Sequence, residues 1–108
     1  MPNDRLEKIQ KLYEEDIENS FLLYALALEY QACGELSLSI EFFEKLRDLD
    51  PGYLGLYYPL TGLYNQVGNK DLALIRVKEG LEWALKKNNL KTRSELEGLM
   101  NSIQELDE

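Results

Sequence analysis

The chain has 108 residues, a length typical of one domain, and 44% hydrophobic residues, enough for a modest core. Its formal net charge of −8 argues against binding to nucleic-acid phosphates or to anionic membranes, because like charges repel. Histidine is absent, which removes the commonest general base and metal ligand, and the single cysteine, Cys33, excludes an internal disulfide.

The beginning of the chain predicts a one-sided helix over residues 3–16. Apolar residues recur there at spacings of three and four, which is the pattern of a helix with one face against a core. Asp4, followed three residues later by Glu7, predicts a capping box at the start of this helix.

A second helix is predicted over residues 21–33. Its apolar residues lie on more than one side, so we expect it to be contacted from more than one direction. Either Asn19 or Ser20 is expected to cap its first free N–H groups. Gly34 is expected to end it, because a left-handed residue after a helix is easiest without a Cβ.

The middle of the chain predicts a third helix over residues 36–49, which Asp50-Pro51 ends, and a fourth over residues 53–67. Pro59 lies well inside the fourth helix, where a proline removes one hydrogen bond and crowds the carbonyl four residues earlier. Two outcomes remain open. The fourth helix is kinked, or its first turn is irregular and its regular part starts near Tyr58.

The last third of the chain predicts a fifth helix, capped by Asn69 or Asp71 and reaching about Lys87, and a sixth over residues 92–106. No segment alternates apolar and polar residues over a sustained run, so we expect no sheet. The sixth helix carries one apolar stripe, made of Leu96, Leu99, Met100, Ile103 and Leu106.

An internal repeat becomes visible when the chain is shifted by 34 residues against itself. A period near 34 residues, built of two antiparallel helices, is typical of helical repeat proteins, in which each pair covers the apolar face of the next. The shift superposes Leu26 on Leu60, Tyr30 on Tyr64, Gly34 on Gly68, Ser39 on Ala73 and Phe43 on Val77.

Each repeat has the same order of residue types. Its first helix has a large residue, then a leucine followed by a small residue, and then a tyrosine. A glycine turn follows, and the second helix has a small residue with an apolar residue four positions later. The first helices carry Leu23, Leu26, Ala27 and Tyr30, then Tyr57, Leu60, Thr61 and Tyr64. The turns and second helices carry Gly34, Ser39, Phe43 and Asp50-Pro51, then, less closely, Gly68, Ala73 and Val77. These residues resemble the tetratricopeptide repeat family.

The resemblance implies an all-α fold, a right-handed array of antiparallel helix pairs forming one domain over residues 1–108. Its two full repeats would be residues 20–53 and 54–87. Residues 3–16 would be the second helix of a lost repeat. Residues 92–106 would be the solvated capping helix that such arrays need.

The resemblance also implies a function, because the first helices of this family line a concave groove that holds a peptide or a partner helix. The groove-facing residues would be Phe21, Tyr24, Leu28, Gln31, Tyr58, Gly62, Asn65 and Gln66. Exposed aromatic residues of this kind are common anchors at interfaces. The cationic residues with which some members hold a carboxylate are missing here, so we expect an apolar or basic protein or peptide as partner.

Two alternatives stay open. The flanking helices could cover Phe21 and Leu28 as ordinary core, and the chain could be a structural protein that associates with copies of itself, for example as a homodimer. No enzymatic activity, metal or cofactor is expected, and Cys33 is interpreted as a structural thiol. The chain lacks an apolar signal core and an apolar run of about 18 residues, which predicts a cytoplasmic protein that binds no membrane.

Overall fold

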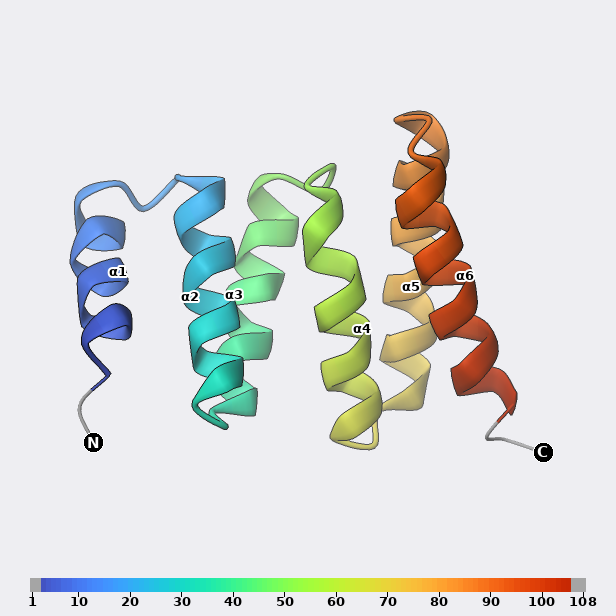
Figure 1. Ribbon diagram of the computed structural model, residues 1–108, viewed down its shortest axis with the longest axis horizontal. Helices are drawn as coiled ribbons and strands as arrows, with labels where there is room; N and C mark the ends of the chain where they lie inside the picture. The colour runs from blue at the N-terminus through green and yellow to red at the C-terminus, as the bar shows by residue number, and fades with distance from the viewer. Residues whose placement is uncertain (1–2, 106–108) are drawn as a thin grey trace. The chain divides into compact units, whose positions relative to one another are not determined.

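The computed structural model describes residues 3–105, and over this range it contains six α-helices, one short 3-10 helix and no strand (Figure 1). The all-α prediction is confirmed. The chain divides into two compact units between Tyr53 and Leu54, at the boundary expected between the two repeats. The helices are α1 (Asp4–Glu15), α2 (Ser20–Ala32), α3 (Leu36–Leu49), η1 (Leu54–Leu56), α4 (Tyr57–Gln66), α5 (Lys70–Lys86) and α6 (Leu90–Glu105).

Asparagine side chains start most of these helices, because each amide oxygen accepts a hydrogen bond from a free N–H in the first turn. Asn3 accepts from the N–H of Leu6, so the expected capping box at Asp4 is wrong. Of the alternatives left open for later helices, the structure selects two residues. Asn19 caps α2, and Asn69 caps α5. Helix α6 starts two residues before the expected position, because Asn89 caps it.

Three helices end in the same hydrogen-bonded turn. Gly34 and Gly68 adopt φ angles of +79° and +85° after α2 and α4, as expected, and Asn88 adopts φ +56° after α5. In each case the next residue donates its N–H to a carbonyl five residues earlier, as Glu35 does to Tyr30 at 2.9 Å. The left-handed residue turns the chain back, so the following helix runs antiparallel.

Pro59 does not kink a helix. The segment before it forms the 3-10 helix η1, and α4 begins only at Tyr57, so Pro59 occupies the third position of α4. An N–H in the first turn has no partner within its own helix, and a proline there loses nothing. The irregular first turn, one of the two outcomes left open, is therefore the observed one.

The first unit is built on α2, which packs against α1 on one side and α3 on the other. Its core includes Leu23 and Leu26 of α2 with Phe43 and Leu46 of α3. Helix α1 only covers this core, because none of its residues is buried. At the crossing of α2 and α3, Ser39 Oγ donates to the carbonyl of Ala27 at 2.6 Å.

The second unit packs α4, α5 and α6 against one another. Leu56, Leu60, Leu63 and Ile103 are fully or almost fully buried in its core. Ala73 is also completely buried, as its small-residue position predicts. Helix α6 buries Leu96 and Ile103 and leaves Leu99 and Met100 half-buried, while Leu106 lies outside the described residues.

Candidate functional site

The expected groove residues of α2 form a half-exposed apolar face in the first unit. Phe21 is 65% exposed, and Tyr24, Leu28 and Gln31 are half-buried. Helix α2 is apolar on both sides, because one side joins the core and the other carries these residues. None of the four is fully buried, so α1 does not cover Phe21 and Leu28 as ordinary core.

Tyr24 is held in place by two further aromatic rings. Its ring meets that of Phe43 edge-on at 6.2 Å and lies 5.2 Å from the ring of Tyr53. Burial raises the pKa of the Tyr53 phenol, and the neighbouring Tyr24 and Asp50 add to this increase. Tyr24 therefore anchors the start of α2 to the end of α3 and offers only part of its ring to a ligand.

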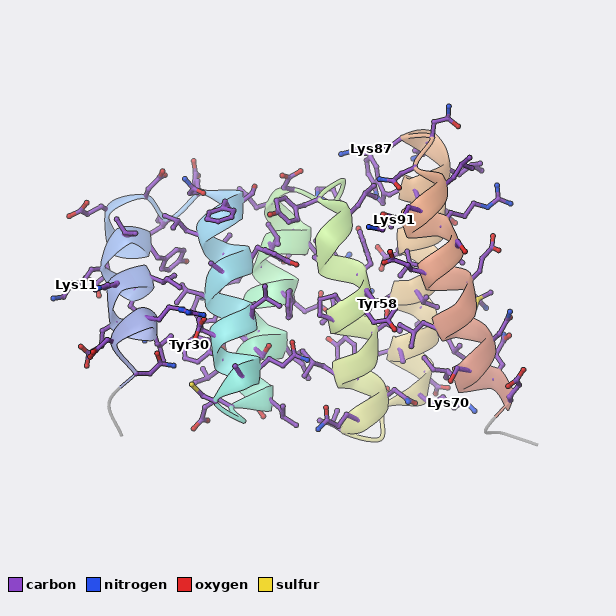
Figure 2. The ribbon with its side chains drawn as sticks, in the orientation of Figure 1. Lys11, Tyr30, Tyr58, Lys70, Lys87 and Lys91 are labelled. Atoms are coloured by element: carbon purple, nitrogen blue, oxygen red, sulfur yellow. The ribbon has the colours of Figure 1, made fainter. Side chains whose placement is uncertain are left out.

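The expected groove residues of α4 lie in the second unit. Tyr58 is 50% exposed and Asn65 is half-buried, while Gln66 is exposed. A Cβ added to Gly62 would have no atom within 4 Å, so this glycine leaves the surface of α4 open. Figure 2 shows Tyr58 on the side of α4 that faces α6.

An open pocket of about 370 Å³ lies between α4 and α6. Tyr58 is the expected groove residue that lines it, and α6 supplies the rest of the wall. The residues of this wall have small, apolar or acidic side chains, and none of them is a cation. The α6 residues are Ser94, Glu95, Gly98, Leu99 and Ser102.

The sequence does not identify these five residues, because residues 92–106 were expected to form a solvated cap. One signal was available. Ser94, Gly98 and Ser102 follow one another at intervals of four, which places three small side chains on one face of a helix. Small side chains leave room beside the helix, and this is the face opposite Tyr58.

A second open pocket, of about 400 Å³, lies between α5 and α6. Its apolar residues are Leu81, Leu85 and Met100, and its charged residues are Glu82, Arg93 and Glu97. Arg93 already pairs with Glu97 at 2.8 Å. The stripe expected on α6 is thus divided, with Leu99 in the first pocket and Met100 in the second.

Among residues 3–105 no group of three or more carboxylate and thiol side chains is placed to hold a metal ion. Cys33 is exposed at the end of α2, and its Sγ accepts a hydrogen bond from Asn3 at 3.0 Å. In the same part of the chain, no helix has the length and apolarity that crossing a membrane requires.

No known family model and no curated protein matches the chain. Several solved structures do match the chain. A tetratricopeptide repeat domain protein from Salinibacter ruber is 33% identical in its crystal structure, with 82% of this chain and 98% of that chain covered and a TM-score of 0.78. Its solution structure matches with 34% identity over 84% of this chain and 92% of that chain, at a TM-score of 0.80.

The translocator chaperone SycD of type III secretion in Yersinia enterocolitica has the same fold at 16% identity, with 94% of this chain and 71% of that chain covered and a TM-score of 0.87. The likeness to SycD is one of fold alone. The two Salinibacter ruber matches are similar enough in sequence, over enough of both chains, to show the family as well. This chain belongs to the tetratricopeptide repeat family.

Proposed function

We propose that this chain is a non-catalytic protein interaction module, which binds a peptide or a partner helix on the exposed faces of its first helices. The observation that carries the proposal is the pocket between α4 and α6, where half-exposed Tyr58 stands beside Leu99 and three small residues. A half-exposed tyrosine in an open groove is a typical anchor for a partner, since it offers a large contact area at a small entropic cost.

The chemistry of the pocket favours an apolar or basic ligand. Tyr58 and Leu99 offer apolar surface, and Glu95 is the one charged residue of its wall. An acidic ligand would meet Glu95 without a cation to compensate it, and such a contact between like charges is unfavourable. We therefore expect an aliphatic or aromatic side chain to enter the pocket, with a lysine or arginine near Glu95.

The proposal can be tested with a phage-displayed library of random peptides selected on the purified protein. An enriched peptide is synthesised, and its affinity is measured by calorimetry for the wild type and for two variants of the pocket. Tyr58→Ala should weaken binding about tenfold or more, as loss of an interface anchor does. Ile75→Ala is the matched control, because Ile75 is also 50% exposed but lies on α5 outside both pockets.

The second variant, Gly98→Leu, fills the pocket instead of emptying it. A Cβ added to Gly98 has no neighbour within 4 Å, and replacing a glycine inside a helix stabilises it by about 0.5–1 kcal/mol. Lost binding together with unchanged or increased stability supports the proposal. Equal affinities in all variants would place the ligand elsewhere, and a consistently acidic enriched peptide would contradict the expected partner chemistry.

A further inference from the structure

The turn joining α5 to α6 carries the most exposed large apolar side chains of the second unit. Leu85 is 64% exposed and Leu90 is 71% exposed. No residue from Leu85 to Glu95 is buried, and Figure 1 shows this turn projecting beyond the first turn of α4. Covering exposed leucines would be favourable, so this turn is a candidate contact surface for another molecule. We call residues 85–93 the basic tip.

The basic tip concentrates positive charge in a chain that is acidic overall. Lys86, Lys87, Lys91 and Arg93 are four of its 12 lysines and arginines, and no acidic residue lies between Trp83 and Ser94. Figure 2 shows Lys87 and Lys91 at this end of the α5–α6 pair.

The stability of α5 and α6 explains only part of the positive charge of the basic tip. Lys86 lies at the end of α5, where a cation is favourable, and its Nζ also lies 4.6 Å from the centre of the Trp83 ring. Lys91 and Arg93 lie in the first turn of α6, where a cation opposes the helix dipole. Arg93 is offset by its ion pair with Glu97 at 2.8 Å, so Lys91 is the cation that needs another reason for its position.

The turn joining α1 to α2 has the opposite character. Its segment contains two exposed apolar side chains, Leu12 at 52% and Ile17 at 62%, together with Glu14, Glu15, Asp16 and Glu18. The acidic residues lie at the end of α1, whose last turn contains no base, and anions there also oppose the dipole. We call residues 12–18 the acidic tip.

We propose that the basic tip of one copy of this chain docks on the acidic tip of another copy. Each tip has two exposed aliphatic side chains and four charged residues within one short segment, and the charges of one tip are opposite to those of the other. Contact would cover all four aliphatic side chains and bring charges of opposite sign together. Anionic membranes and nucleic acids could also meet the charge of the basic tip, but they would leave the acidic tip without a counterpart.

The basic tip of one copy meets the acidic tip of another whether two copies exchange both contacts in a two-fold dimer or add head to tail. Each tip is small, so the association is weak, and exposed charges drive it, so salt suppresses it. Self-association should be clear in low salt of about 0.1 M, where a Debye length of about 10 Å screens the net charges of two copies more than the charges in contact, and absent in about 1 M salt, where the Debye length is about 3 Å.

Sedimentation velocity of the whole chain at increasing concentration tests the proposal with two charge-reversed variants. Lys87→Glu/Lys91→Glu lowers the net charge of the basic tip from +4 to 0, and Glu15→Lys/Glu18→Lys raises that of the acidic tip from −4 to 0. Each variant alone should associate at least about tenfold more weakly than the wild type, which corresponds to about 1.4 kcal/mol. An equimolar mixture of the two should associate again, because the unchanged acidic tip of the first variant can dock on the unchanged basic tip of the second.

The control is Lys70→Glu/Lys78→Glu, which changes the net charge by the same amount on α5 outside the tip. It should associate as the wild type does, and the far-ultraviolet dichroism and melting temperature should show that all variants are folded. The proposal is overturned if the wild type sediments as a monomer in low salt. It is equally overturned if both reversed variants associate alone, or if their mixture does not.

Discussion

Each helix pair has one alanine and one hydroxyl-bearing residue at corresponding positions of the repeat, but the two residues are exchanged between the first and the second helix. In the pair α2–α3 the first helix has Ala27 and the second has Ser39, whereas in the pair α4–α5 the first has Thr61 and the second has Ala73. All four are completely buried. Ser39 Oγ donates to the carbonyl of Ala27 at 2.6 Å, but Thr61 Oγ1 has no hydrogen-bond partner among the described residues.

At a second pair of corresponding positions the residues of the two units differ in size. The first unit has Leu23 on α2 and Leu46 on α3, both buried. The second unit has Tyr57 on α4 and Gly80 on α5, and a Cβ added to Gly80 would lie 2.7 Å from the Cβ of Tyr57 and 2.8 Å from Cδ1 of Leu96. One repeat pattern thus permits two packings, because a larger residue on one helix is matched by a smaller residue on the other.

The largest effects are expected where alanine replaces the residue that each second helix contributes at these positions, which is Leu46 on α3 and Gly80 on α5. Leu46→Ala should cost about 3 kcal/mol, because it leaves a cavity in the core of the first unit. Gly80→Ala should cost about 2 kcal/mol for the opposite reason, because its Cβ would force α4 and α6 away. The free energy of unfolding, measured by urea denaturation, checks both.

Gly98→Ala is the control for Gly80→Ala. Both replace a glycine inside a helix of the second unit, but nothing lies within 4 Å of a Cβ at Gly98. This variant should be stabilised by about 0.5–1 kcal/mol. If Gly80→Ala is stabilised as well, the close approach of α4 and α5 at this point is wrong.

The hydroxyl groups at the two crossings should give smaller effects of opposite sign. Ser39→Ala should cost about 1 kcal/mol, because a buried hydrogen bond is lost. Thr61→Val should stabilise the protein by about 1 kcal/mol, because it replaces a buried hydroxyl that lacks a partner by a methyl group of similar shape. Thermal unfolding of the two variants beside the wild type measures the difference. A destabilised Thr61→Val would mean that the hydroxyl is hydrogen-bonded in solution.

The smallest effect concerns pH and is confined to the first unit. Because burial raises the pKa of Tyr53, the folded chain retains this proton at a pH where the unfolded chain has released it. Stability should therefore fall as the pH rises above about 10, the ordinary value for tyrosine, towards the raised pKa. Tyr53→Phe should reduce this loss, as measured by urea denaturation across that range. An unchanged slope would show that Tyr53 does not contribute.

The candidate site was less predictable than the helices that carry it. Tyr58 was expected in a groove and lines a pocket, but Gly62, Asn65 and Gln66 do not line that pocket. Its other wall comes from α6, whose position against α4 depends on how closely both helices approach α5. That distance is set by Gly80, Tyr57 and Leu96 together, and no local pattern reveals it.

The sequence by itself determined the helices, their order and the repeat, because each of these depends on residues close together in the chain. Apolar residues at spacings of three and four define the helices, and Gly34 and Gly68 end two of them, whereas the choice of Asn19 over Ser20 and of Asn69 over Asp71 came from the structure. Only the tertiary structure decided which side chains are buried, which hydroxyl finds a partner and where a pocket opens. These features depend on distances between helices, which the packing of many side chains settles together.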